Sequence, residues 1–177
     1  MVPQSSQTTT LETGNKISDN NYSAGQVKIL PSDCCFKENG IFAVVPNELL
    51  SDGNASGFLP RERHLGRKKA VEKVQIDDNI TVVCEEGESH PIVALLRKSL
   101  EIDNANIATA VEGKRMFVVA AKKGKALFAN CFAINSEEDM LYYLLAVCEH
   151  LGFEPSKTPM ATESRVPELV KRYFEVR

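Results

Sequence analysis

The fold of this chain is decided by residues 106–152, which read NIATAVEGKRMFVVAAKKGKALFANCFAINSEEDMLYYLLAVCEHLG. Three apolar, β-prone runs, 107–111, 115–121 and 126–134, are separated by two short turns that each contain a glycine. Glycine supplies the positive φ that a tight hairpin requires, and connections this short leave no room for a crossover. The stretch therefore predicts a three-stranded antiparallel meander.

The same stretch ends in a helix with recognisable start and stop signals. Ser136 predicts the N-cap, and Asp139 three residues later approximates a capping box. Gly152 and Pro155 end the helix, because a glycine suits the C′ position and a proline cannot continue it. The apolar residues at helical spacing, which predict one buried stripe, are Leu141, Leu144, Leu145, Cys148 and Leu151.

The elements predicted outside this stretch have weaker patterns. They are strands over 26–30, 40–45 and 79–84, one helical turn over 47–50, a helix over 91–100 after Ser89, a weak strand over 158–162 and a terminal helix over 168–176. Residues 70–76 fit a strand or a short helix equally, and the polar residues 51–69 predict a connection without a packed element. The order of the elements predicts an α+β or mixed α/β fold with helices on the faces of a sheet.

Composition narrows the class of protein. The 177 residues are 43% hydrophobic, which is enough for a core, and the net charge of −3 argues against general nucleic-acid binding. No apolar run approaches the ~18–20 residues that a membrane span needs, and the first residues lack the features of a secretory signal. The five cysteines have no framework spacing, which favours a reducing compartment. We expect a cytoplasmic protein without a membrane span, whose partner is an unidentified protein.

Four segments carry a resemblance to a known family. They are GKALFANCF at 124–132, EDMLYYLL at 138–145, LGFEP at 151–155 and, upstream, FAVVPNELL at 42–50. In these segments the chain resembles the family called domain of unknown function 3822, and the resemblance extends over roughly residues 26–50 and 106–155. The order of three strands, a helix, a strand and a helix is also similar to the ribonuclease-H-like lobe of the actin and Hsp70 superfamily.

The resemblance implies an actin-like fold of two ribonuclease-H-like lobes, cytoplasmic and of unknown activity. On this basis residues 1–25 are expected to be a flexible polar tail, 26–104 a partial N-terminal lobe and 105–177 the C-terminal lobe. The incomplete first lobe would make this chain a shortened or divergent member.

The resemblance also locates a candidate nucleotide site. In ATPases of this superfamily the first hairpin of each lobe holds phosphate through backbone N–H groups, with a carboxylate that organises Mg²⁺. The equivalent turn here contains Glu112, Gly113 and Lys114, where Glu112 would replace the acid and Lys114 would approach phosphate. An ordinary hairpin turn explains the same residues, and the adenine-side segment Met160–Glu163 has no glycine.

The leading hypothesis is therefore a non-catalytic interaction or scaffold protein with no catalytic residue, no cofactor and no metal. The alternative is a nucleotide-binding ATPase that uses ATP and Mg²⁺ at Glu112, Gly113 and Lys114. A third hypothesis, a thiol-dependent regulator, rests on the adjacent Cys34 and Cys35.

Three further features have ordinary structural explanations. The basic run at 61–69 lacks interleaved aromatic residues and predicts a solvated loop. Cys34 and Cys35 have no partner at zinc spacing. Of the paired Tyr142 and Tyr143, one is expected to pack against the core and the other to face a partner.

Overall fold

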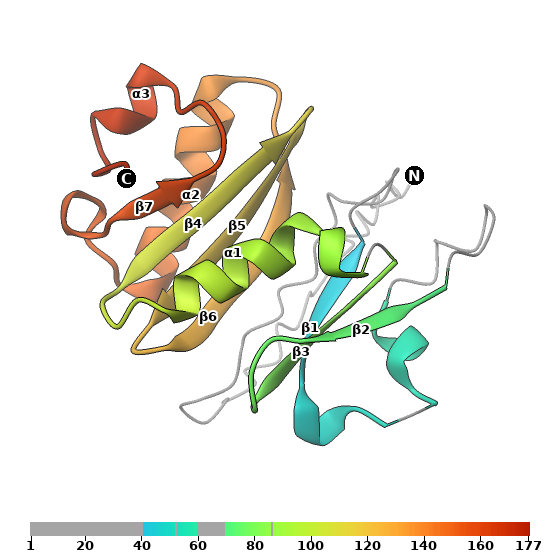
Figure 1. Ribbon diagram of the computed structural model, residues 1–177. Coiled ribbons are helices and arrows are strands. Elements are labelled where there is room, and N and C mark those ends of the chain that lie inside the picture. The colour runs from blue at the N-terminus through green and yellow to red at the C-terminus, as the bar shows by residue number, and fades with distance from the viewer. Residues whose placement is uncertain (1–40, 52, 60–69, 86) are drawn as a thin grey trace, which may run out of the picture.

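The computed structural model describes residues 41–51, 53–59, 70–85 and 87–177 (Figure 1). The predicted tail at 1–25 and the predicted strand at 26–30 lie outside the described residues.

The first sheet has three strands in the order β1-β3-β2. Its strands are β1 (Phe42–Pro46), β2 (Glu72–Gln75) and β3 (Ile80–Cys84), and β3 pairs antiparallel with both neighbours. The described residues after β1 include the 3-10 turns η1 (Asn47–Leu49) and η2 (Ala55–Phe58), and η4 (Gly87–Ser89) follows β3. The ambiguous residues 70–76 thus contain a strand, since β2 completes the sheet.

The second sheet contains the meander, which is confirmed. Its strands are β4 (Asn106–Glu112), β5 (Arg115–Lys122), β6 (Lys125–Ala133) and β7 (Met160–Thr162), in the order β6-β5-β4-β7. The meander strands pair antiparallel, whereas β7 is parallel to β4. The weak strand expected near 158–162 therefore exists, and a parallel bridge from Met160 to Val176 lies beside it.

The two hairpin turns of the meander use different backbone conformations. In the first turn Gly113 has a φ of 60°, and Lys114, the other central residue, has no positive φ. In the second turn Lys123 and Gly124 both have positive φ, 55° and 65°, which is the pattern of a type I′ turn. A lysine in this region is strained, because its Cβ approaches the following carbonyl.

Two helices follow the sequence pattern closely. The first is α1 (Pro91–Leu100), and the second is α2 (Glu137–Leu151), followed by η5 (Pro155–Lys157). The Ser136 hydroxyl accepts a hydrogen bond from the Asp139 N–H at 3.2 Å, as predicted. The Asp139 carboxylate accepts the Asn135 N–H at 2.8 Å, one residue earlier than in a standard capping box.

The helices lie on opposite faces of the four-stranded sheet (Figure 1). Helix α1 covers one face, and α2 with the short α3 (Glu168–Lys171) covers the other. The α2 residues that are buried are Met140, Leu144, Val147 and Cys148, while Leu141, Leu145 and Leu151 are only partly buried. The predicted stripe was therefore rotated, because it left out Met140 and Val147.

The two sheets share one hydrophobic cluster. The inner face of the first sheet contributes Val44 and Val82, and the second sheet contributes Phe117 and Val119. Helix α1 contributes its apolar face to the same cluster, with Leu96 fully buried. The division into lobes at 26–104 and 105–177 stays a prediction.

Two sequence expectations were wrong in detail. The connection at 51–69 does contain packed residues, because Ala55 and Leu59 are buried against the outer face of the first sheet beside Val83. The terminal helix is shorter than expected and ends at Lys171. The chain leaves the helix because Val176 pairs with Met160, and Val170 and Phe174 still pack in the core.

We expect Lys123→Asn to raise the free energy of unfolding by about 0.5 kcal/mol, because asparagine tolerates the left-handed conformation better than lysine does. Chemical denaturation of the two proteins measures this difference. The matched control is Lys114→Asn in the other hairpin, where φ is not positive and no gain is expected. An equal gain in both variants would show that backbone strain at Lys123 is not the cause.

Candidate functional site

The hairpin between β4 and β5 brings the predicted site residues together at one exposed turn. Glu112 pairs with Arg115 across the two strands, and Gly113 and Lys114 are the two residues between them. Glu112, Gly113 and Lys114 are all exposed, and a Cβ built on Gly113 would meet nothing within 4 Å. Glycine is therefore needed here for its φ and not for a close approach to another group.

The charged side chains of this turn contact one another and their neighbours. The Arg115 guanidinium lies 3.4 Å from the Glu112 carboxylate, and both side chains are partly in solvent. The Lys114 ammonium lies 3.4 Å from the Asn135 amide oxygen. Exposed ion pairs of this kind stabilise a protein by roughly 0.2–1 kcal/mol, so they orient the side chains weakly.

A row of rings leads from this turn into the core. The Arg115 guanidinium lies 5.6 Å from the centre of the Phe117 ring, which is fully buried. The His90 ring meets Phe117 edge-on at 5.4 Å and Phe42 of β1 at 5.2 Å. His90 therefore joins the first sheet to the second, and the turn is the solvent-exposed end of this row.

His90 is also the N-cap of α1, a role that the sequence analysis missed. Its Nδ1 accepts the Ile92 N–H at 3.2 Å, and the side chain is 1% exposed. Histidine is not among the preferred N-cap residues, whereas the neighbouring Ser89 is of a preferred type. Pro91 at the first helical position was the available signal, because it marks the residue before it as the cap.

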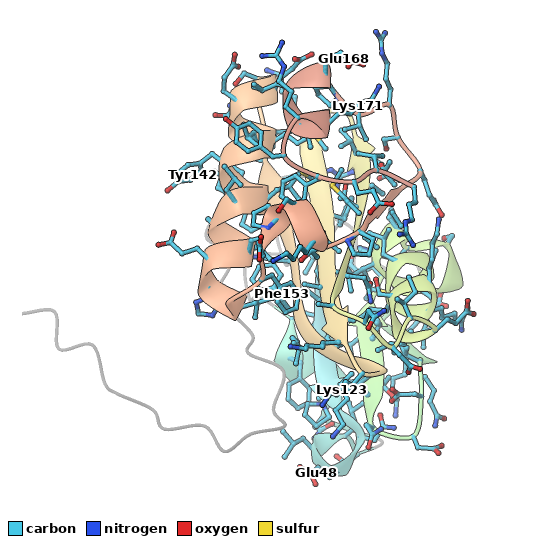
Figure 2. All side chains as sticks on the ribbon, turned by 90° about the vertical axis from the view of Figure 1, so that its left-hand side faces the viewer. Glu48, Lys123, Tyr142, Phe153, Glu168 and Lys171 are labelled. Atoms are coloured by element: carbon cyan, nitrogen blue, oxygen red, sulfur yellow. The ribbon has the colours of Figure 1, made fainter. Side chains whose placement is uncertain are left out.

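A second cluster of aromatic side chains lies on β6 and α2. Phe128 stacks on Phe132 with ring centres 6.1 Å apart, and Phe132 stacks on Tyr143 at 4.4 Å. Tyr142 meets Tyr143 edge-on at 5.4 Å, is 68% exposed and extends from the helix into solvent (Figure 2). The packing of one of the paired tyrosines is confirmed, since Tyr143 packs and Tyr142 is exposed; that Tyr142 faces a partner stays a prediction.

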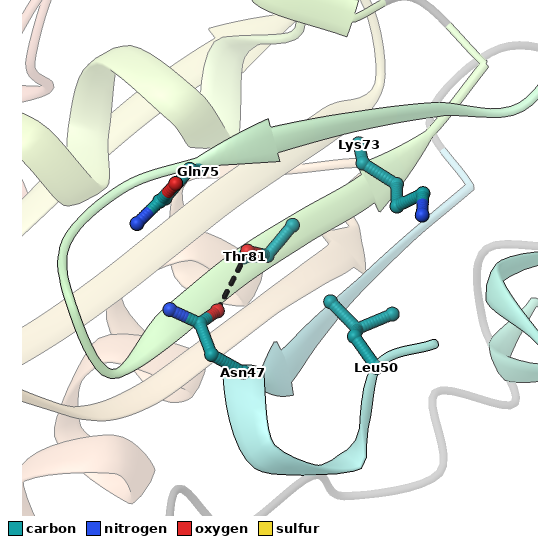
Figure 3. Close-up of a pocket in the computed structure, with 5 residues that line it drawn as sticks. All are labelled: Asn47, Leu50, Lys73, Gln75 and Thr81. Carbon is teal, nitrogen blue, oxygen red and sulfur yellow. Dashed lines mark hydrogen bonds between the residues drawn. The ribbon is translucent and has the colours of Figure 1, made fainter. Parts of the chain in front are cut away.

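The outer face of the first sheet holds an open groove of about 470 Å³ (Figure 3). Its described lining residues are Asn47, Leu50, Lys73, Gln75 and Thr81. No local sequence pattern alone indicates this groove, because its lining residues come from three separate segments. The alternation of Lys73 and Gln75 along β2 was the one available signal, as residues two apart in a strand share a face.

The remaining candidates of the sequence analysis do not form a site among the described residues. Cys34, Cys35 and the basic run at 61–69 lie outside that part of the chain. Cys84, Cys131 and Cys148 are buried, and burial raises the pKa of the Cys148 thiol to about 11. In the described ranges, no three His, Cys, Asp or Glu side chains are grouped as metal ligands, and no helix is long and apolar enough to cross a membrane.

Comparison with known proteins finds a family model that matches part of the second half of the chain. Residues 88–173 match the family model DUF3822, a protein of unknown function. The resemblance seen in the sequence to this DUF3822 family is therefore confirmed. No curated protein matches the chain.

The fold is similar to that of a solved structure. The chain is similar to a Bacteroides thetaiotaomicron protein described as having an actin-like ATPase fold and unknown function, with 19% sequence identity and a TM-score of 0.58. The match covers 78% of this chain and 64% of the other, so this chain spans less than two thirds of its neighbour. At this identity the similarity shows the fold alone, and it confirms the predicted mixed α+β, actin-like class.

We expect His90→Ala to lower the free energy of unfolding by about 2–4 kcal/mol, because it removes a buried ring and a helix cap. His90→Asn restores a preferred cap without the ring and should recover about 1 kcal/mol of this loss. Urea denaturation measures both values, with the exposed Lys98→Ala on α1 as the control. If His90→Asn is no more stable than His90→Ala, the cap contributes nothing measurable.

Proposed function

We propose that this protein is a non-catalytic interaction protein of the DUF3822 type, which binds a protein partner through the exposed face of α2. The observation that carries the proposal is Tyr142, whose ring is 68% exposed and yet held against the packed Tyr143. Aromatic residues with a polar tip are enriched at protein interfaces, because one end is apolar and the other tolerates water.

The charge around Tyr142 indicates the chemistry of the partner. Glu138 lies one helical turn before Tyr142 and Glu149 two turns after it, and both are exposed. Ala146 lies between Tyr142 and Glu149 and leaves room for a side chain. An aromatic face flanked by carboxylates suits a basic segment that also carries aliphatic groups, since cations interact favourably with both. We infer a basic protein partner and not a nucleic acid.

The geometry of the β4–β5 hairpin also supports the absence of catalysis. A phosphate-holding loop directs successive backbone N–H groups at one anion. The turn at Gly113 and Lys114 has only two residues, and the Glu112 carboxylate already pairs with Arg115. The segment Met160–Thr162, considered for the adenine side, is the strand β7 and pairs with β4.

A cytoplasmic location belongs to the same proposal. The five cysteines have no framework spacing and the Cys148 side chain is a free thiol, which suits a reducing compartment. The partner would then be another cytoplasmic protein.

A thermal-shift measurement with Mg²⁺ and ATP separates this proposal from its alternative, an ATPase with Glu112, Gly113 and Lys114 at the phosphates. We expect no change in the unfolding midpoint. A nucleotide at ~100 times its dissociation constant would stabilise the protein by ~2.7 kcal/mol. A rise in the midpoint that disappears in Glu112→Ala would establish the nucleotide site and reject the non-catalytic assignment.

Fluorescence anisotropy with a labelled peptide of alternating lysine and leucine residues tests the α2 face. We expect saturable binding that weakens as salt is added, and about threefold to fivefold weaker binding for Tyr142→Ala. Tyr173→Ala is the matched control, because Tyr173 is 47% exposed but lies beyond α3. Equal losses in the two variants, or no binding to the unmodified protein, would contradict the proposed interface.

A further inference from the structure

The hairpin between β5 and β6 carries a compact cluster of positive charge. Lys122, Lys123 and Lys125 are all exposed, and only Gly124 separates the last two. None of the three ammonium groups forms an ion pair or a hydrogen bond with the described residues. Their charge is therefore available to a group outside this copy of the chain.

Two features of this hairpin oppose its stability. Lys122 and Lys125 are direct partners across the two strands, and like charges opposite each other destabilise a sheet. Lys123 has a φ of 55°, a conformation that a lysine adopts at a cost. Departures from local preference that gain no contact within the folded chain are expected at functional positions. The lysine cluster is therefore a candidate contact surface.

The hairpin is held in place by the segment that follows α1. The Lys123 N–H donates to the Asp103 carbonyl at 2.7 Å, and the Leu100 carbonyl oxygen lies 3.6 Å from the position that a Cβ on Gly124 would take. A turn fixed in this way loses little freedom on binding. The lysine stems are aliphatic, so the cluster offers apolar surface beside its charges.

The α2 face has the complementary chemistry. Glu138 and Glu149 are exposed on either side of Tyr142, and neither carboxylate forms an ion pair with the described residues. A lysine ammonium interacts favourably with a carboxylate and with a tyrosine ring, which its stem can also cover. Tyr142 and Lys123 lie well apart (Figure 2), so the two surfaces do not meet within one copy.

We propose that the basic segment bound by the α2 face is the β5–β6 hairpin of a second copy of this chain. This rests on the proposed function, which supplies the receiving surface. The two surfaces differ, so the contact is heterologous: a pair leaves one hairpin and one α2 face unoccupied, and further copies can join. The net charge of −3 on each copy opposes association only weakly at physiological salt, where the Debye length is about 8 Å.

Two variants of the full chain separate the two surfaces. The hairpin variant carries Lys122→Gln, Lys123→Asn and Lys125→Gln, and asparagine tolerates the left-handed conformation at the central position. The α2 variant carries Glu138→Gln and Tyr142→Ala. Each variant keeps one surface, so its self-association should be about tenfold weaker than that of the unmodified chain. A mixture of the two should form a pair that does not grow.

Nuclear magnetic resonance of the isotopically labelled hairpin variant measures this association. Adding the unlabelled α2 variant should give saturable shifts of the backbone signals around Tyr142, with a dissociation constant on the order of 0.1–1 mM. Raising the salt from about 0.1 to 0.5 M should weaken the association at least about threefold. Adding unlabelled hairpin variant instead should give no such shifts.

A matched control separates the hairpin from net charge. An α2 variant that also carries the three hairpin substitutions should no longer shift the signals around Tyr142. An α2 variant that carries Lys98→Gln, Lys114→Gln and Lys157→Gln loses the same charge at other exposed positions and should still shift them.

The proposal is overturned by the absence of saturable shifts up to about 1 mM, by equal binding of the two lysine-substituted partners, or by shifts that avoid the α2 face. The lysine–leucine peptide keeps the two proposals distinguishable. If the peptide binds at Tyr142 and the copies do not associate, the second copy is rejected as the partner and the proposed function stands. If neither binds, both are rejected.

Discussion

Helix α1 is the element on which the rest of the structure depends, because its apolar face is buried in the cluster that both sheets share and the polar backbone groups at its ends need hydrogen-bond partners. Its side chains Ile92, Leu95 and Leu96 are at most 1% exposed. A helix leaves its first N–H groups and last carbonyls without partners inside the helix, and a buried end needs side chains or water to satisfy them. Here His90 accepts the Ile92 N–H at one end. At the other end the Asn106 amide donates to the carbonyls of Ser99 and Asn104 at 3.1 and 3.0 Å.

The two caps also explain how the sheets are held relative to each other. His90 contacts Phe42 of the first sheet and Phe117 of the second, so the residue that caps the helix also fills the space between the sheets. Asn106 is the first residue of β4, so the C-terminal cap fixes the start of the meander. The β4–β5 hairpin lies at the far end of this assembly, where Arg115 covers the Phe117 ring. Its charged residues are therefore close to a rigid core, although the turn itself is open.

Local patterns predicted the meander and its helix because turn chemistry, strand pattern and capping agreed within one stretch of sequence. The same logic failed at His90, since its role arises from contacts with Phe42 and Phe117, which are 48 residues before and 27 residues after it in the numbering. It failed again at the groove, where Asn47 meets Thr81 across 34 positions. The error in the predicted stripe of α2 has a related cause. Met140 and Val147 are buried because they pack with residues of the second sheet and α3, which their spacing in the helix alone does not predict. Each miss involves a tertiary contact that no short window contains.

At the edge of the second sheet, the proposed binding of a partner would use side chains more readily than strand addition. β6, which has nine residues, is a terminal strand of the described sheet. The backbone N–H and C=O groups along such an edge can pair with a strand of another chain. The Cys131 N–H is already donated to the Asn130 Oδ1 at 2.8 Å, and the register shift at Ala120/Ala121 interrupts the ladder towards the other end. An added strand would have to break the hydrogen bond between the Cys131 N–H and Asn130, and its own register would have to follow the irregularity in β6. The aromatic side chains beside this edge carry no such penalty, because Phe132 and Tyr143 are already stacked and Tyr142 is already exposed. Recognition at this face therefore costs least when it uses the rings and carboxylates of α2 and leaves the strand edge as it is.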